Sequence, residues 1–369
     1  MKTIVSLPVH ECRRVIEDQL RNLSYFFEDV TIILHLSQSY KENTDFSMFH
    51  NVHVNPNRYP SRWGNVAYLH YANIKYALDE KIPFEYAVFC SSNELYIRKG
   101  VESYLQSSPV FMDPHGILTR EGRFLYAPKR NVFYMRTALT DGCFADETLW
   151  HFVTTHQLPG ICKSQIEGSA YHHTIVEKMW AILEKEFGLE YMMSAKYCAE
   201  EMLLPTVFLA LNQKLASEGH SIIPKHQFSF VDWYHDFTVG MWIRAVRYWN
   251  GKHNRRLERY LQSIDAQHNI YAIKGVKRTY FNKIRNVVRK LIPTPALSKS
   301  DVREYAIADF HYNLALLKKE LVPGKFVLTA ANETLGVLSR IIGKPKSHLK
   351  WYVRDRALAV AKKRGWKIG

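Results

Sequence analysis

The chain has 369 residues, of which 47% are hydrophobic and 23% charged, so it can bury a sizeable core and wholesale disorder is excluded. Its five cysteines are scattered without a Cys-x-x-Cys pair, which argues against a disulfide framework or a structural zinc site. The apolar run at the N-terminus is too short for a signal peptide, and no stretch approaches the roughly 20 apolar residues that cross a bilayer. We therefore expect a globular, reduced, cytoplasmic protein.

The formal net charge of +15 is concentrated near one end of the chain. Residues 275–369 hold 21 basic and 6 acidic residues, an excess of 15, so the first 274 residues are neutral overall. A neutral body followed by a basic region predicts a local anionic partner, such as a phosphate group, a nucleic acid or an acidic membrane surface.

Strands and helices alternate in the first hundred residues. Apolar, β-branched runs predict buried strands at 3–9, 30–36 and 85–90, and apolar residues at helical spacing predict helices at 12–27 and 65–78. This alternation predicts an α/β fold with a mostly parallel sheet that helices cover on both faces. Ligands of such sheets bind beyond the carboxyl ends of the strands, here residues 8–10, 35–37 and 91–94.

The later part of the chain is predicted to be mainly helical. Residues 111–160 show no clear periodicity, whereas helical spacing predicts helices at 171–187, 200–215, 255–264 and 305–319. The segment 291–300 contains two prolines and little periodicity, so we place a domain boundary there. The predicted domains are residues 1–290 and a basic, mainly helical extension of residues 291–369.

Several common enzyme motifs are missing from the sequence. It contains no Gly-x-Gly-x-x-Gly, phosphate-binding P-loop, Gly-x-Ser-x-Gly or His-Glu-x-x-His segment. It also contains no Asp-x-Asp triplet, the usual carboxylate pair by which sugar-nucleotide enzymes hold a divalent metal. Dinucleotide-dependent, P-loop and simple serine-hydrolase functions therefore lose most of their support.

Six short segments remain that combine aromatic, small and charged residues. In chain order they are Tyr59-Pro-Ser-Arg-Trp-Gly64, Tyr86-Ala-Val-Phe-Cys-Ser-Ser-Asn-Glu-Leu-Tyr-Ile97, Glu167-Gly-Ser-Ala-Tyr171, Ala199-Glu-Glu-Met-Leu-Leu-Pro-Thr206, Phe230-Val-Asp-Trp233 and Ile270-Tyr-Ala-Ile-Lys-Gly-Val-Lys-Arg278. Over roughly residues 1–285 this series resembles the inverting glycosyltransferase family of core-2/I-branching β-1,6-N-acetylglucosaminyltransferases and peptide O-xylosyltransferases. The order and spacing of the segments carry the resemblance, because each segment alone is weak.

The family's motifs match this sequence segment by segment. A Trp-Gly segment precedes a helix, and a Ser-Gly-x-Asp-x-Pro-Ile-like turn corresponds to Ser91-Ser-Asn-Glu-Leu-Tyr-Ile97, where Glu94 replaces Asp and the Gly and Pro are absent. A Gly-Ser-x-Trp/Tyr segment corresponds to Gly168-Ser-Ala-Tyr171, and the segment bearing the catalytic base corresponds to Ala199-Glu-Glu201. The membrane anchor and disulfides of animal members are missing, so the resemblance is to a bacterial-type member.

The resemblance implies a fold of the GT-A type, a Rossmann-like sheet flanked by helices, and a set of site residues. Glu201 is expected to be the catalytic base. Residues expected to bind the donor are His10, Arg62, Trp63, Lys274, Lys277 and Arg278. Residues expected to bind the acceptor are Glu94, Tyr171, Asp232 and Trp233.

Elementary chemistry agrees with these roles. Inverting transfer needs a carboxylate that accepts the proton of the acceptor hydroxyl, and it needs positive charge near the departing diphosphate. Without an Asp-x-Asp segment, fixed Lys and Arg side chains must supply that charge, so we expect neither a metal nor another cofactor.

A purely structural role is open for most of these residues. Glu201 can simply favour the start of a helix, and Glu200 is the base if the alignment is shifted by one residue. Glu94 can stabilise a turn, and Trp63 can belong to the core. A solvated surface can explain Lys274, Lys277 and Arg278, and a structural role can explain Asp232 and Trp233.

The predicted function is metal-independent, inverting transfer of a hexosyl or pentosyl group from a nucleotide sugar, expected to be UDP-linked. The expected acceptor is a hydroxyl of a glycan or a lipid-linked glycan in polysaccharide biosynthesis. Basic residues beside Trp and Tyr in 344–367 predict peripheral contact with the anionic inner face of the cell membrane, although a solvated helix explains them equally well. No nucleic-acid partner is expected for this function, because the sequence lacks a recognisable nucleic-acid-binding module. The alternative function is a basic, non-catalytic protein that binds nucleic acid or an anionic polymer.

Overall fold

The computed structural model describes residues 1–62, 65–122, 125, 142–231, 269–274, 276, 278, 280–293, 298, 300, 302, 305–306 and 309. The chain divides into two compact units, Met1–Val276 and Lys277–Gly369. The boundary predicted between residues 290 and 291 remains a prediction, and the predicted helix at 255–264 lies outside the described residues.

The centre of the first unit is a six-stranded sheet with the strand order β3-β2-β1-β4-β9-β6. Its strands are β1 (Thr3–Val9), β2 (Val30–Leu36), β3 (Val52–Val54), β4 (Tyr86–Phe89), β6 (Val110–Phe111) and β9 (Ala170–His172). The four strands β3, β2, β1 and β4 run parallel, and β9 is antiparallel to both β4 and β6. The predicted α/β class with a mostly parallel sheet is therefore confirmed.

The described residues of this unit also form two smaller sheets. The three-stranded sheet has the order β10-β11-β5 and consists of β5 (Glu94–Tyr96), β10 (Ser229–Val231) and β11 (Ala272–Lys274). The two-stranded sheet pairs β7 (Pro114–Leu118) with β8 (Ile161–Ser164) in antiparallel fashion.

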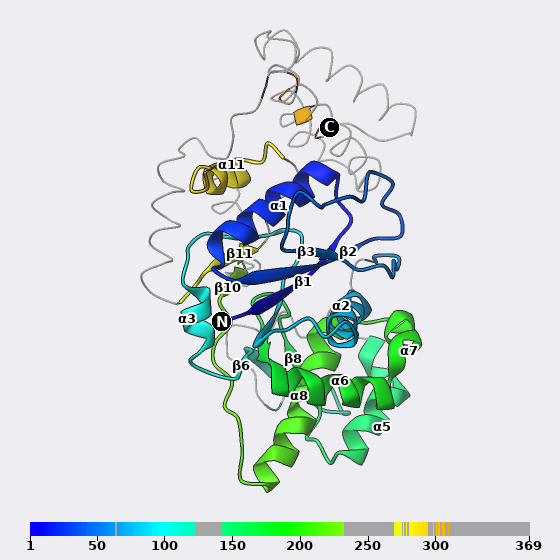
Figure 1. Cartoon of the computed structure of the whole chain (residues 1–369). Helices are drawn as coiled ribbons and strands as arrows, with labels where there is room; N and C mark the ends of the chain where they lie inside the picture. Colours follow the sequence, from blue (N-terminus) through cyan, green and yellow to red (C-terminus); the bar gives the residue numbers. More distant parts are fainter. Residues whose placement is uncertain are drawn as a thin grey trace, which may run out of the picture. The chain divides into compact units, whose positions relative to one another are not determined.

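Helices cover both faces of the central sheet, as Figure 1 shows. Helix α1 (Arg13–Phe26) lies on one face, while α2 (Ala67–Asp79), α6 (His173–Glu186) and α8 (Ala199–Ser217) lie on the other. The described residues of the unit also form α3 (Val101–Leu105), α5 (Glu147–Thr155) and α7 (Gly188–Ser194). Helix α1 forms where predicted because Val15, Ile16, Leu20 and Leu23 make one buried stripe at helical spacing.

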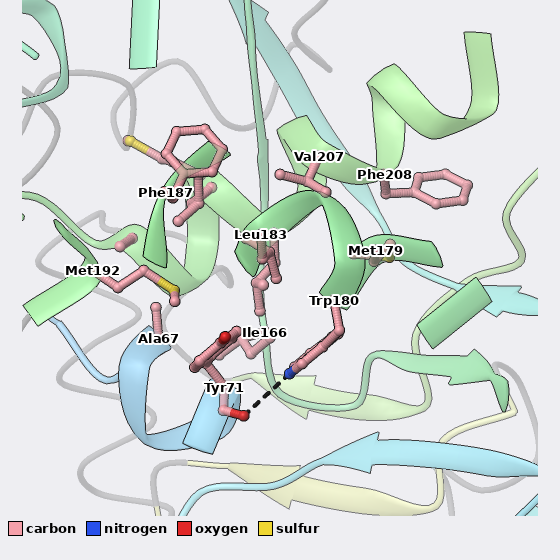
Figure 2. Close-up of a cluster of buried hydrophobic side chains, with 14 of the residues drawn as sticks. Ala67, Tyr71, Ile166, Met179, Trp180, Leu183, Phe187, Met192, Val207 and Phe208 are labelled. Carbon is pink, nitrogen blue, oxygen red and sulfur yellow. Dashed lines mark hydrogen bonds between the residues drawn. The ribbon is translucent and has the colours of Figure 1, made fainter. Parts of the chain in front are cut away.

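A large hydrophobic core of the described residues includes side chains of the sheet and of the helices α2, α6 and α8. Figure 2 shows part of this core, in which Leu183 of α6 is fully buried and Val207 and Phe208 of α8 contribute apolar side chains. The indole of Trp180 packs in the same core and donates a 3.1 Å hydrogen bond from Nε1 to the carbonyl of Tyr71. Burial of this apolar surface is the main force that holds the helices on the sheet.

The predicted start of the helix at 171–187 is wrong by two residues. The helix expected to start at Tyr171 starts at His173, because Ala170–His172 forms β9 between β4 and β6. The preceding Gly168 has φ +74°, and a Cβ there would lie 2.5 Å from the Cβ of Ser229. Glycine is therefore required at this point, where β10 approaches the start of β9.

The second unit is described only in part. Its helix α11 (Lys283–Arg289) starts at Asn282, whose side-chain oxygen accepts a 2.9 Å hydrogen bond from the N–H of Ile284. The carboxylate of Asp309 accepts hydrogen bonds of 2.7 Å from the N–H groups of Tyr280 and Phe281. Most of the predicted basic extension, and most of the predicted helix at 305–319, lies outside the described residues.

Candidate active site

The carboxyl ends of β1 and β4 meet at one edge of the sheet. Glu11, two residues after the end of β1, is buried and accepts hydrogen bonds from the hydroxyl of Ser92 at 2.5 Å and from the N–H of His10 at 2.9 Å. The side chain of His10 is 42% exposed, and its Nε2 lies 3.5 Å from Glu11 Oε1. His10 therefore lies at the edge where ligands of parallel sheets bind, although its donor-binding role remains a prediction.

Glu94 joins three segments beside that edge. Its carboxylate accepts hydrogen bonds from the N–H of Ser91 at 3.2 Å and from the hydroxyl of Ser229, and its backbone carbonyl accepts one from Gln19 at 2.5 Å. The side chain is fully buried, and this burial raises the pKa of Glu94 to about 7. Direct contact with an acceptor would need the side chain to be uncovered, so the acceptor-binding role of Glu94 remains a prediction.

The start of α8 distinguishes the two glutamates that the sequence left open. Glu200 is buried and accepts a 3.0 Å hydrogen bond from the N–H of Val66, directly before α2. Glu201 keeps 20% of its side chain exposed. Glu200 therefore links the starts of two helices, whereas Glu201 is the more exposed member of the pair.

Burial acts on both carboxyl groups at the start of α8. It raises the pKa of Glu200 to about 7, with a further increase from the neighbouring charge of Glu201. Burial also raises the pKa of Glu201, but the ammonium group of Lys163 opposes that effect. Lys163 therefore favours the ionised form of Glu201, although burial keeps the pKa of Glu201 above its ordinary value.

Two lysines bring positive charge to this group of carboxylates. Lys163 of β8 is 6% exposed, and its Nζ lies 3.8 Å from Glu201 Oε2. Lys274, the last residue of β11, forms an ion pair with the buried Glu167. Although burial opposes ionisation of Glu167, Lys274 and a hydrogen bond from Gln165 hold the pKa of Glu167 below its ordinary value.

The backbone brings these side chains together from distant parts of the chain. Lys274 is opposite Glu94 in the antiparallel pairing of β11 with β5, and β10 brings Ser229 against Glu94. The negative charge of Glu167 acts to raise the pKa of both Glu94 and Glu200, and the positive charge of Lys274 acts to lower the pKa of Glu201. We call the residues Glu94, Lys163, Glu167, Glu200, Glu201 and Lys274 the charged cluster.

The rest of the predicted site residues fall into three groups. Tyr171 is buried in β9, with its hydroxyl 3.6 Å from the sulfur of Met112, whereas the exposed Arg62 donates a hydrogen bond to the carbonyl of Met193. Arg278 belongs to the second unit. The remaining predicted residues lie outside the described part of the chain: Trp63, Lys277, Asp232 and Trp233. The roles of all of them remain predictions.

Sequence reasoning missed two members of the charged cluster. Glu167 stands directly before the Gly-Ser segment that carries the family resemblance, so its position in that segment was the available signal. Lys163 is a single charge inside an apolar strand, which is an unusual place for a lysine. Neither signal identifies the ionic partner, because Glu201 is far from Lys163 in the sequence and Lys274 is far from Glu167.

Two further properties concern the described residues alone. Within them, no group of three or more His, Cys, Asp or Glu side chains is arranged to hold a metal ion. No helix among them is long and apolar enough to cross a membrane.

Comparisons with known proteins give only distant likenesses. No protein-family profile matches the chain, and no curated protein matches its sequence. Among solved structures, S. aureus TarS is similar at 10% identity with a TM-score of 0.34 and covers 97% of this chain. The apo-form glycosyltransferase GlyE of Streptococcus pneumoniae TIGR4 is similar at 10% identity with a TM-score of 0.29 and covers 86% of this chain.

This chain spans 53% of the length of TarS and 64% of that of GlyE. Likenesses at these TM-scores carry no weight for the activity. The functional proposal therefore depends on the charged cluster and on the motif series in the sequence.

Proposed function

We propose that the protein is an inverting glycosyltransferase of the GT-A type that uses Glu201 as its general base. The observation that carries this proposal is the partly exposed Glu201 carboxylate at the start of α8, 3.8 Å from a buried lysine and close to a second lysine at the end of β11. The motif series supports the same assignment, because Glu201 occupies the position of the family's base.

In the proposed reaction the Glu201 carboxylate accepts a proton, and a basic side chain stabilises the leaving group. As the acceptor oxygen bonds to the anomeric carbon of the donor, its proton moves to the Glu201 carboxylate. The bond from that carbon to the phosphate oxygen breaks, and its electron pair leaves with the nucleoside diphosphate. Lys274 is proposed to stabilise the negative charge that forms on the diphosphate.

The donor is proposed to be a UDP-linked hexose or pentose, and the acceptor a hydroxyl of a glycan or lipid-linked glycan. Metal independence belongs to the same proposal, and it rests on the missing Asp-x-Asp segment. A thermal-shift screen of nucleotides and UDP-sugars in EDTA tests these points, since a ligand that binds the folded state raises its apparent stability. We expect UDP to stabilise the protein, and UDP-sugars to be slowly hydrolysed with release of UDP.

Two results of this screen would contradict the proposal. Strict dependence of both binding and turnover on a divalent cation would remove the metal-independent mechanism. Tight binding of duplex nucleic acid, with no response to any nucleotide sugar, would favour the alternative of a non-catalytic binding protein.

Membrane contact through the basic residues beyond position 290 is a separate proposal. It is supported by the charge excess of residues 275–369. The full chain should sediment with vesicles that contain phosphatidylserine and should be released by salt, whereas replacing Lys362, Lys363 and Arg364 by glutamate should weaken sedimentation. Equal sedimentation with neutral and anionic vesicles would contradict this proposal.

A further inference from the structure

Lys163 is a buried charge that the motif series does not include. It lies in β8 with 6% of its surface exposed, and its Nζ is 3.8 Å from Glu201 Oε2. A lysine is rarely placed in such an environment unless its charge is balanced. Its position beside the proposed base therefore needs a functional or structural explanation.

The backbone fixes the position of this lysine relative to Glu201. The hydroxyl of Thr206, on α8, accepts a 2.9 Å hydrogen bond from the N–H of Cys162 and donates one of 2.6 Å to the carbonyl of Met202. Strand β8 is thus held against α8 at the residue next to Lys163. Pro205 lacks an N–H group, so it cannot donate to the carbonyl of Glu201 as an ordinary helical residue would.

Several charged groups of the described residues interact with Glu201. Glu200 precedes it on α8, Glu167 approaches from before β9, and Lys274 approaches from β11. Cys198 lies just before α8, and the negative charge of Glu201 contributes to raising the pKa of its thiol. Burial and Glu167 raise the pKa of Glu201, whereas Lys163 and, more weakly, Lys274 lower it.

Lys163 and Lys274 form ion pairs with different carboxylates, Glu201 and Glu167. Lys274 is already paired with Glu167, which lowers the pKa of that carboxyl group. Lys163 is the stronger of the two influences that favour the ionised form of Glu201. Only the ionised form can accept a proton from an acceptor hydroxyl.

We propose that Lys163 is a positioning residue, which holds the Glu201 carboxylate ionised and in place for the proton transfer. This inference rests on the proposed function, because it assumes that Glu201 is the base. Lys163 itself is not assigned a contact with the donor or the acceptor. Its role can be measured directly on Glu201, without a transfer assay.

The first measurement follows the titration of Glu201 in the full chain. Carboxyl-labelled glutamate is observed by ¹³C NMR, and the Glu201 signal is identified by its loss in Glu201→Gln. Lys163→Met should raise the pKa of Glu201 by roughly 1–3 units, the usual effect of removing an opposite charge at this range. Lys163→Arg should restore the wild-type titration, and Lys75→Met, which removes a half-exposed lysine of α2, should leave it unchanged.

The second measurement is the pH profile of transfer. In Lys163→Met the acidic limb of kcat/KM should move to higher pH by the same amount as the Glu201 titration. Activity should therefore fall roughly 10-fold or more at a pH below the wild-type limb and recover at a pH above the shifted limb. The affinity for UDP should change less than about 2-fold. A purely structural role for Lys163 would lower activity equally at all pH values.

The outcomes separate the two proposals. An unchanged Glu201 titration in Lys163→Met overturns the role of Lys163, whether or not the protein is an enzyme. A large loss of UDP affinity also overturns it, because Lys163 would then be a donor-binding residue. A shifted titration in a protein that turns over no nucleotide sugar overturns the proposed function instead. If Lys163→Met fails to fold, Lys163→Gln provides the same test with a polar replacement.

Discussion

Replacing Glu200 by glutamine should make the folded protein more stable at alkaline pH. Glu200 is buried, and its pKa rises to about 7 from an ordinary value of 4.5. The folded state therefore retains the proton of Glu200 over a pH range in which the unfolded chain has lost it. By linkage, the stability contributed by the protonated group is fully present below about pH 4.5 and is lost as the pH rises through 7.

The size of this effect follows from the shift. At about 1.4 kcal/mol per pH unit, ionisation of Glu200 should destabilise the folded state by about 2–3 kcal/mol between about pH 5 and pH 8. Glutamine cannot ionise, and its amide oxygen can still accept the hydrogen bond from the N–H of Val66. Glu200→Gln should therefore match the wild type near pH 5 and exceed its stability near pH 8.

Guanidinium unfolding, followed by tryptophan fluorescence at several pH values, measures this difference. Glu190→Gln is the matched control, because Glu190 is an exposed carboxylate in the first turn of α7. The Glu200→Gln protein should keep part of the pH dependence of stability, because Glu94 is still present and its pKa is also about 7. Identical pH dependence of Glu200→Gln and the wild type would refute the reasoning, because Glu200 would then ionise in the folded state without penalty.

Two further changes test the core and the donor site. Leu183→Ala should lower the free energy of unfolding by about 2–5 kcal/mol, because it removes a fully buried side chain from the hydrophobic core. Guanidinium unfolding measures this loss, and a value below about 1 kcal/mol would contradict the packing in Figure 2. Lys274→Met should weaken UDP binding by about 1.5–3 kcal/mol, measured by calorimetry after circular dichroism has confirmed folding. Unchanged UDP affinity would remove Lys274 from the proposed donor site.

Local sequence patterns predicted the main elements of the fold. The expected strands at 3–9 and 30–36 match β1 and β2, and the expected helix at 200–215 lies within α8, which spans Ala199–Ser217. These elements are long enough for their hydrophobic spacing to be diagnostic. The three-residue strand β9 was missed because it is defined by pairing with β4 and β6, not by its own short sequence.

The candidate site was predictable only in part for the same reason. The sequence predicted Glu201 as the base through its local motif but left Glu200 as an alternative. The structure separates the two, since Glu200 is buried against the start of α2 and Glu201 is partly exposed. The pairing of Glu201 with Lys163 depends on how β8 is held against α8 through Thr206, and no local pattern encodes that contact.

The most direct test of the account is the rate of sugar transfer by Glu201→Gln, measured with the donor and acceptor that support turnover in the wild type. Glutamine keeps the shape of the side chain but cannot accept the proton, so transfer should fall by roughly 10²–10⁴-fold while UDP affinity stays within about 2-fold. Glu200→Gln, measured in parallel, should lose far less activity. Near-normal transfer by a folded Glu201→Gln protein would contradict the assignment of the base and the mechanism built on it.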